Sequence, residues 1–384
     1  MDRRSFLKTS LISSACLAPQ IKFPYLFGAE KYAGPNIIII RFGGGVRRKE
    51  TIQSKYTYAP FFNKVLMPQG TLFSNMIIRK GEGIESSHEQ GTLRILNGNY
   101  QMKKGDEGGV FDSHYQPDTA TLFELMRKNF NLPEHKTLMI NNEDRLQEEF
   151  FTFSKSNDFG SKYKGHVLSL HRFKLFILRN KLKALSGESK AKKLMLKELK
   201  KLETFSKKIN FEIEFPEIIN QFWANWYKLY GDSGLRNERG DRLLTQLSLM
   251  ALKKLKPNFL MVNYNDPDYV HWGFKAHYTR GISIIDNGLQ EIYRFCQHDP
   301  YYKNNTYFVV VPDCGRDNSR AAAIPYQHHF GSKSSREIFT FITGPNIKKG
   351  KIDNKQCDQI DVVSTISHLL QIKNNQTQGK RLAI

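Results

Sequence analysis

Carboxylate, thiol and imidazole side chains stand directly after two predicted strands in this sequence. Asp313 and Cys314 follow the apolar run YFVVVP, and Asp268 and His271 lie three residues apart just past the run NFLMVN. A carboxylate and an imidazole at this spacing can turn toward one cation, and zinc accepts such a mixed ligand set. A solvent-facing turn after the first run, and a histidine that caps the next helix, are the alternative interpretations. We therefore expect a site for a divalent metal, with zinc as the metal.

Two adjacent histidines could complete this site. The loop QHHFGS supplies His328 and His329 ahead of another predicted strand. Neighbouring side chains on a loop can point in opposite directions, so we expect one of the two to bind the metal, while the other could position it. Cys314 is a further candidate, because a thiolate binds zinc and a nearby cation lowers the pKa of a thiol.

Strands and amphipathic helices alternate along the chain, which predicts the elements that must position these residues. The run NIIIIRFGGG is typical of a central parallel strand that enters a glycine loop. Later strands, such as 259–264 and 307–312, each follow a helical pattern. This alternation indicates an α/β fold with a mostly parallel central sheet flanked by helices. Ligands of such sheets bind beyond the carboxyl ends of the strands, so we expect the candidate ligands around one cavity.

A lysine-rich stretch, 178–208, carries a large share of the net charge of +21. Its leucines recur at near-helical spacing, which predicts an amphipathic helix or helical hairpin within a helical insertion at 155–235. A solvated face on an inserted arm, contact with a membrane surface and nucleic-acid binding are the possible interpretations of such a helix. No base-reading motif accompanies the lysines, so we expect no nucleic-acid partner.

Composition and the N-terminus bound the class of protein. With 384 residues, 40% hydrophobic and 12% aromatic, the chain can bury a sizeable core and is not disordered.

The start MDRRSFLK, followed by a short apolar run, predicts a twin-arginine export signal over 1–29, with a basic start to an ordinary helix as the alternative. Such a signal implies export of the folded chain to the periplasm or the cell surface. Cys16 stands in a loose lipid-attachment motif. The three cysteines beyond it cannot all pair, which excludes a disulfide scaffold.

The order of these features resembles the alkaline phosphatase and sulfatase superfamily. The segment GPNIKKGKIDNKQCDQIDVVSTISHLL, 344–370, is similar to a late motif and helix of sulfatases, and HEQGTLRILNG, 88–98, is similar to the helix that begins near the nucleophile. Gly315-Arg316, with the twin-arginine signal, resembles an exported branch of that superfamily. The resemblance implies one alkaline phosphatase-like α/β domain over 30–384, interrupted by the lysine-rich insertion.

The resemblance also implies roles for single residues. Asp268, His271 and one of the two adjacent histidines match one complete metal site of the family, and Asp313 matches the bridging acid of a second site. Cys314 stands where a histidine of that second site belongs, and Arg41 stands where an acid should end the first strand. The resemblance therefore implies one metal site and a degenerate second one.

The family nucleophile aligns with His88 in this chain. Ser86, Ser87 or Thr92 would take that role after a local shift of the alignment, and a metal-bound water is a further alternative.

Two functions are consistent with these residues. The first is an exported, metal-dependent hydrolase of phosphate or sulfate esters, in which Arg41, Arg94 and Arg316 hold the anionic group of a small ester or of a sulfated or phosphorylated glycan. The alternative is a catalytically degenerate member of the superfamily that binds an anion or a glycan. A cationic side chain at Arg41 would repel a second metal ion and attract an anion, which supports the alternative. Three ligands of one metal site persist in order, however, so we expect the hydrolase.

Overall fold

The apolar runs of the sequence form one central sheet. In the computed structural model, which describes residues 32–104, 115–142, 146–208, 211–231, 240–271, 273–318, 326–328 and 331–384, the strand order is β10-β2-β9-β8-β1-β7-β5-β6, and β11 pairs with β2. The strands are β1 (Asn36–Arg41), β2 (Thr71–Ile77), β5 (Thr137–Asn141), β6 (His166–Ser169), β7 (Phe259–Asn263), β8 (Thr306–Val311), β9 (Glu337–Thr343), β10 (Lys351–Asp353) and β11 (Cys357–Asp358). Two short strands, β3 (Met102–Lys104) and β4 (Tyr115–Pro117), form a separate hairpin.

Parallel pairing dominates the middle of the sheet. Strand β1 lies between β7 and β8 and is parallel to both, and β5 is parallel to both β7 and β6. Strand β9 is antiparallel to β8 and to β2. The predicted mostly parallel sheet with flanking helices is therefore confirmed, and β9 is its reversed strand.

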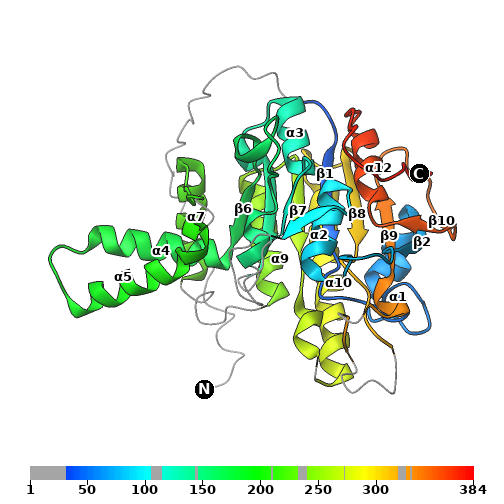
Figure 1. Ribbon diagram of the computed structural model, residues 1–384, viewed down its shortest axis with the longest axis horizontal. Helices are drawn as coiled ribbons and strands as arrows, with labels where there is room; N and C mark the ends of the chain where they lie inside the picture. The colour runs from blue at the N-terminus through cyan, green and yellow to red at the C-terminus, as the bar shows by residue number, and fades with distance from the viewer. Residues whose placement is uncertain are drawn as a thin grey trace, which may run out of the picture. The chain divides into compact units, whose positions relative to one another are not determined.

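Helices cover both faces of this sheet (Figure 1). The longer helices are α2 (His88–Asn97), α3 (Leu122–Phe130), α4 (Leu170–Ala184), α5 (Lys190–Leu202), α7 (Glu217–Tyr230), α9 (Asp241–Lys254), α10 (Lys275–His298) and α12 (Asp361–Leu369). Buried side chains of α4, α7, α9 and α10 share one core with Ile38 and Ile40 of β1. On the opposite face, Phe123 of α3 meets Phe259 of β7 edge to face, with ring centroids 4.8 Å apart.

Local sequence signals set the ends of the helices on that second face. Helix α3 begins with a capping box, in which the Thr121 hydroxyl and the Glu124 carboxylate each accept a backbone N–H of the other residue. Helix α2 follows Ser87, whose backbone is extended, and ends at Gly98, whose φ of 68° favours glycine. The chain therefore enters α2 at a fixed point, which puts His88 on its first turn.

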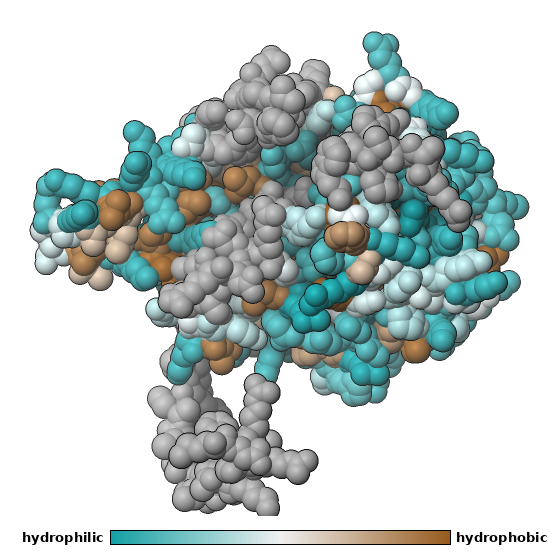
Figure 2. All heavy atoms as spheres, turned by 90° about the horizontal axis from the view of Figure 1, so that it is seen from below, coloured by the Kyte–Doolittle hydropathy of each residue, from teal (hydrophilic) through white to brown (hydrophobic). Residues whose placement is uncertain are grey.

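The range 155–235 contains more than an arm of helices. It contributes β6 to the edge of the sheet and, from α7, the fully buried Trp223 and Trp226 to the core. Helices α4 and α5 form a hairpin that extends away from the sheet in Figure 1, and no residue of α5 is buried. Figure 2 shows hydrophobic side chains among hydrophilic ones on this arm, where Leu194 is 60% exposed.

The structure does not test the predictions made for the N-terminal segment. The expected export signal, 1–29, and Cys16 lie outside the described residues. In the described part of the chain, no helix combines the length and the apolar character that crossing a membrane requires.

Candidate metal and anion site

The loop after β1 builds one wall of the site around Asp313. The backbone N–H groups of Gly44, Gly45 and Cys314 donate to the Asp313 carboxylate at 3.3, 3.2 and 2.8 Å. A side chain at Gly43 would place its Cβ 2.1 Å from the carbonyl oxygen of Tyr264, so this close approach requires glycine. The three glycines of the sequence thus let the loop fold over the end of β8 and fix Asp313.

Asp268 collects three imidazole rings around one carboxylate oxygen. Its Oδ1 lies 2.7 Å from Nε2 of His88, 2.8 Å from Nε2 of His271 and 3.3 Å from Nε2 of His328. Asp268 and His271 belong to the turn that follows β7, whereas His328 comes from a loop near β9. Ligand atoms of Asp268, His271 and His328 all lie within 4.8 Å of one another. The structure therefore brings together three of the residues that the sequence offered as metal ligands, and their donor set suits a zinc ion.

The tautomer of His328 is fixed by a backbone carbonyl. Its Nδ1 lies 2.9 Å from the carbonyl oxygen of Ser86, which can only accept a hydrogen bond. Burial, together with the nearby charge of His88, lowers the pKa of His328 well below its ordinary value, so the ring is neutral. Nε2 then carries a lone pair, and this lone pair faces the Oδ1 atom of Asp268. This oxygen also lies 3.6 Å from Nη2 of Arg316. The lone pair of His328 and the carboxylate oxygen of Asp268 are both atoms that can bind a cation.

His88 spans the two carboxylates of the site. Its Nδ1 lies 2.7 Å from Oδ2 of Asp313 and its Nε2 lies 2.7 Å from Oδ1 of Asp268. Burial by itself would lower the pKa of His88, but the charges of Asp268 and Asp313 outweigh burial and raise this pKa well above its ordinary value. The ring is therefore an imidazolium in the chain without metal, and both of its nitrogens are engaged.

Arg41 is fully buried at the end of β1. Its Nη1 donates to the Thr92 hydroxyl and, at 2.7 Å, to the carboxylate of Glu148, while its Nε lies 3.9 Å from Oδ2 of Asp313. Burial opposes ionisation of Asp313, but the charges of His88 and Arg41 keep the pKa of this carboxyl below its ordinary value. A guanidinium thus neutralises the acid that the resemblance assigned to a second metal. Sequence reasoning missed Glu148, because nothing in NNEDRLQEE distinguishes it from its acidic neighbours.

Cys314 lies close to His88 but is held as a thiol. Its Sγ is 3.8 Å from Nδ1 of His88. Burial and the charge of Asp313 raise the pKa of Cys314, so the metal-free chain does not offer a thiolate there. His88, Cys314 and His328 form a second group of ligand atoms within 4.8 Å of one another.

The hydroxyl candidates differ in how they are bonded. Thr92 donates to the carbonyl oxygen of His88 at 2.6 Å and accepts from Arg41, and Ser86 donates to the carbonyl oxygen of His328. Ser87 is buried at the start of α2, and its hydroxyl has no hydrogen-bond partner in the described part of the chain.

The two other arginines are bonded to protein groups. Arg94 donates to the side chains of Gln359 and Gln90 and to the carbonyl oxygen of Glu85, and burial lowers its pKa to about 10. Arg316 is buried too, and it donates to the carbonyl oxygens of Gly44, Gly45 and Tyr326. Both arginines therefore stabilise the loops around the site. His329 lies outside the described residues.

Comparisons with known proteins identify this architecture. No family model matches the sequence, and no curated protein matches it. Among solved structures, a protein in the alkaline phosphatase superfamily from Vibrio parahaemolyticus is 13% identical, with a TM-score of 0.54 over 91% of this chain and 70% of that one. A mutant of alkaline phosphatase PafA is 12% identical, with a TM-score of 0.57 over 92% of this chain and 99% of that one. A 2-O GAG sulfatase is 12% identical, with a TM-score of 0.51 over 91% and 73% of the two chains. These likenesses show that the chain has the fold of the alkaline phosphatase superfamily, which phosphatases and sulfatases share.

Proposed function

We propose that this protein is a hydrolase of phosphate or sulfate esters that works with one divalent cation, held by Asp268, His271 and His328. One observation carries the proposal. The neutral ring of His328 directs a lone pair at a carboxylate oxygen of Asp268 3.3 Å away, and a cation bound between these two ligand atoms and the ring of His271 would stabilise all three. The hydrogen bond from Nδ1 of His328 to a backbone carbonyl is the usual support for a metal-binding histidine.

A bound divalent cation would act as a Lewis acid that polarises the ester and stabilises the negative charge that develops on it. His88 adds a fixed positive charge beside Asp268, because its ring nitrogens are both bonded to carboxylates. Arg41 keeps Asp313 ionised and in place. His88 and Arg41 thus place two positively charged side chains beside the proposed cation site.

Ser87 is the hydroxyl that best fits the nucleophile. Thr92 already donates to a carbonyl oxygen and accepts from Arg41, and both nitrogens of His88 are bonded to carboxylates. The Ser87 hydroxyl lacks a hydrogen-bond partner among the described residues and precedes the N-terminus of α2, whose backbone N–H groups favour an anion. We therefore infer that the Ser87 oxygen attacks the phosphorus or sulfur atom of the ester, with the anionic group held at the start of α2. The bond to the alcohol breaks as the new ester bond to Ser87 forms, and the alcohol leaves with the proton that Ser87 loses. Water then hydrolyses the ester on Ser87.

An anion- or glycan-binding protein without turnover is the second candidate, and Arg41 favours it. Its buried guanidinium contacts both Asp313 and Glu148, so these acids are already neutralised and a second cation has no vacant carboxylate. A two-metal reaction is therefore unsuited to this site, whereas a single-metal reaction and simple anion binding both remain compatible with it.

An assay of ester hydrolysis distinguishes the hydrolase from the binding protein. Purified protein is assayed with p-nitrophenyl phosphate and p-nitrophenyl sulfate, with and without added zinc. The His271→Ala variant should lose at least about a hundredfold in kcat/KM, because the Lewis acid is lost with its ligand. His298→Ala, which removes an exposed histidine at the end of α10, is the matched control and should leave turnover unchanged. Zinc-independent binding of these esters without turnover would favour the second candidate.

Export is the remaining part of the proposal. The start MDRRSFLK supports delivery to the periplasm or the cell surface by the twin-arginine route. Replacing Arg3 and Arg4 by lysine should retain the chain in the cytoplasm on cell fractionation. The lysines of α5 also support contact with an anionic membrane surface.

A further inference from the structure

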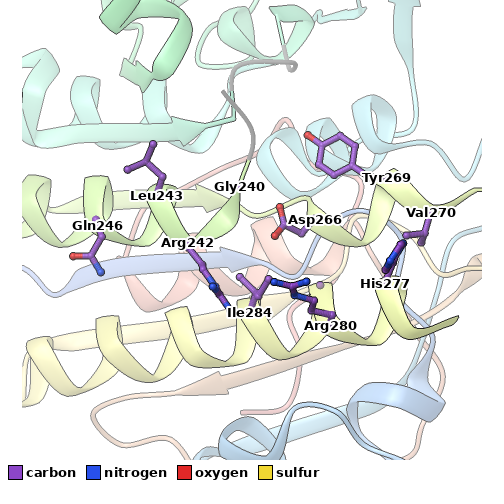
Figure 3. Close-up of a pocket in the computed structure, with 11 residues that line it drawn as sticks. Gly240, Arg242, Leu243, Gln246, Asp266, Tyr269, Val270, His277, Arg280 and Ile284 are labelled. Carbon is purple, nitrogen blue, oxygen red and sulfur yellow. The ribbon is translucent and has the colours of Figure 1, made fainter. Parts of the chain in front are cut away.

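A cavity on the far side of the turn after β7 has no part in the site described above. It has a volume of about 680 Å³ and lies between α9, the 3-10 helix η6 (Asp266–Val270) and α10 (Figure 3). This volume is within the range of small-molecule sites, about 300–1,000 Å³. Asp266 and Tyr269 of η6 line it, whereas Asp268 of the same helix bonds to His88 and His271. One short helix thus separates the cavity from the candidate metal site.

Two arginines give this cavity its charge. Arg242 extends from α9 and Arg280 from α10, and both side chains line the cavity in Figure 3. Neither arginine forms a salt bridge with another residue that the structure describes. Asp266 is the acidic residue of the lining, so the side chains around the cavity carry a net positive charge. Two guanidinium groups that line one cavity repel each other, and an oxyanion bound between them would offset that repulsion and accept hydrogen bonds from both.

Aromatic side chains line the same cavity or lie near its edge. Tyr269 lines the cavity and is 38% exposed, and His277 lines it from the first turns of α10. Phe274, which precedes α10, is 77% exposed and meets His277 edge to face with ring centroids 6.3 Å apart. A phenylalanine this exposed gains nothing from the core, and aromatic faces of this kind bind the apolar face of a ring.

We propose that this cavity is a second ligand site, which binds a small ring-bearing molecule with its oxyanion group between Arg242 and Arg280 and its ring against Tyr269 and Phe274. The oxyanion is a phosphate, a sulfate or a carboxylate, since all three accept paired hydrogen bonds from arginine. The ligand reaches this site without contacting the candidate metal ligands. The proposal therefore does not rest on the proposed hydrolase activity.

The test is a calorimetric titration of the full-length protein with glucose 6-phosphate, glucuronate, inorganic phosphate and glucose. Glucose 6-phosphate or glucuronate should bind more tightly than inorganic phosphate because of the ring contacts, and glucose should not bind. Arg242→Gln and Arg280→Gln should each weaken binding at least about tenfold through the loss of charge-assisted hydrogen bonds. Arg294→Gln removes an exposed arginine from the same helix, α10, outside the cavity, and should have no effect.

His271→Ala separates this site from the candidate metal site. Binding that survives this substitution and is lost in Arg280→Gln supports the proposal whether or not the protein turns over esters. Binding that is lost in His271→Ala and kept in Arg280→Gln would locate the ligand at the metal site and overturn it. Absence of binding at millimolar concentrations of all the anionic ligands, or equal binding of glucose, would overturn it as well. Far-ultraviolet circular dichroism of each variant confirms that the comparison is made between folded proteins.

Discussion

Arg41 and Asp313 face each other at the ends of two adjacent parallel strands, with the guanidinium Nε 3.9 Å from the carboxylate Oδ2 and both side chains fully buried. Burying two charges is costly unless each is paired, and Glu148 and His88 complete the pairing on either side. The interior of the site is thus a set of alternating positive and negative side chains, with the guanidinium of Arg41 beside the acid that the resemblance assigned to a second metal.

Removal of Arg41 should be strongly destabilising. Arg41→Ala leaves the carboxylates of Asp313 and Glu148 without their shared partner, so the free energy of unfolding should fall by about 3–5 kcal/mol. Arg79→Ala breaks a pair with Asp358 in which the arginine is 53% exposed, and it should cost less than about 1 kcal/mol. Urea denaturation of the two variants measures the difference. Similar losses of unfolding free energy in the two variants would show that the buried pair stabilises the fold no more than the exposed pair does.

Arg41→Ala should also create a new cation site. With the guanidinium gone, the buried carboxylate of Glu148 loses its charged partner and Asp313 keeps only His88, so a divalent cation could bind between the two acids. Added zinc or magnesium should therefore raise the melting temperature of this variant more than that of the unchanged protein, and a chelator should reverse the effect. An equal response of both proteins to the metal would contradict this account of Arg41.

Asp286 should make stability depend on pH. Burial raises its pKa to about 6, although the N–H groups of Phe61 and Phe62 donate to its carboxylate at 2.9 and 2.8 Å. The folded chain therefore binds a proton at this carboxyl that the unfolded chain has already lost, so its contribution is present at low pH and is lost as the pH rises to about 6. The stability of the unchanged protein relative to Asp286→Asn should fall by about 3 kcal/mol between about pH 3.5 and pH 7.5. Denaturation curves for both proteins across this range give the difference directly, and a constant difference would show that the carboxyl does not titrate on folding.

The α5 arm should be separable from the fold. Replacing 186–202 with a short glycine linker should leave a cooperative unfolding transition and an unchanged near-ultraviolet spectrum, because α5 has no buried residue. Trp223→Ala, by contrast, empties a fully buried position and should cost about 3–5 kcal/mol. Loss of the folded state on removing α5, measured by circular dichroism, would show that the arm covers part of the core.

Much of this fold could be predicted from the sequence, because hydrophobic patterns are local. The run NIIIIR has four consecutive isoleucines and leads into glycines, which predicts a buried parallel strand, and β1 is such a strand. Strand β9 has an equally apolar pattern but runs antiparallel, since periodicity reports burial and not strand direction. The strand at His166–Ser169 was hidden within the expected helical insertion, because a four-residue apolar run next to a helix looks like its first turn.

The sequence indicated which residues belong to the candidate site, but it did not indicate which of them contact one another. Strand ends converge at one edge of a parallel sheet, which is why Asp268, His271 and one of His328 and His329 could be grouped before any distance was known. The clamp of His88 between two acids depends on how α2 lies across the sheet, and no spacing in the sequence encodes that. Glu148 lies on the short 3-10 helix Leu146–Phe150, and its contact with Arg41 likewise depends on tertiary packing that no sequence spacing encodes.

Metal binding by the unchanged protein and by His271→Ala tests the central claim most directly. Zinc content and zinc affinity are measured by elemental analysis and by competition with a chromophoric chelator at neutral pH. The account predicts one zinc ion per chain at the Asp268 site and a loss of affinity of at least about a hundredfold in His271→Ala, with His298→Ala unchanged. A protein that binds no zinc, or that binds it equally well without His271, would contradict the account.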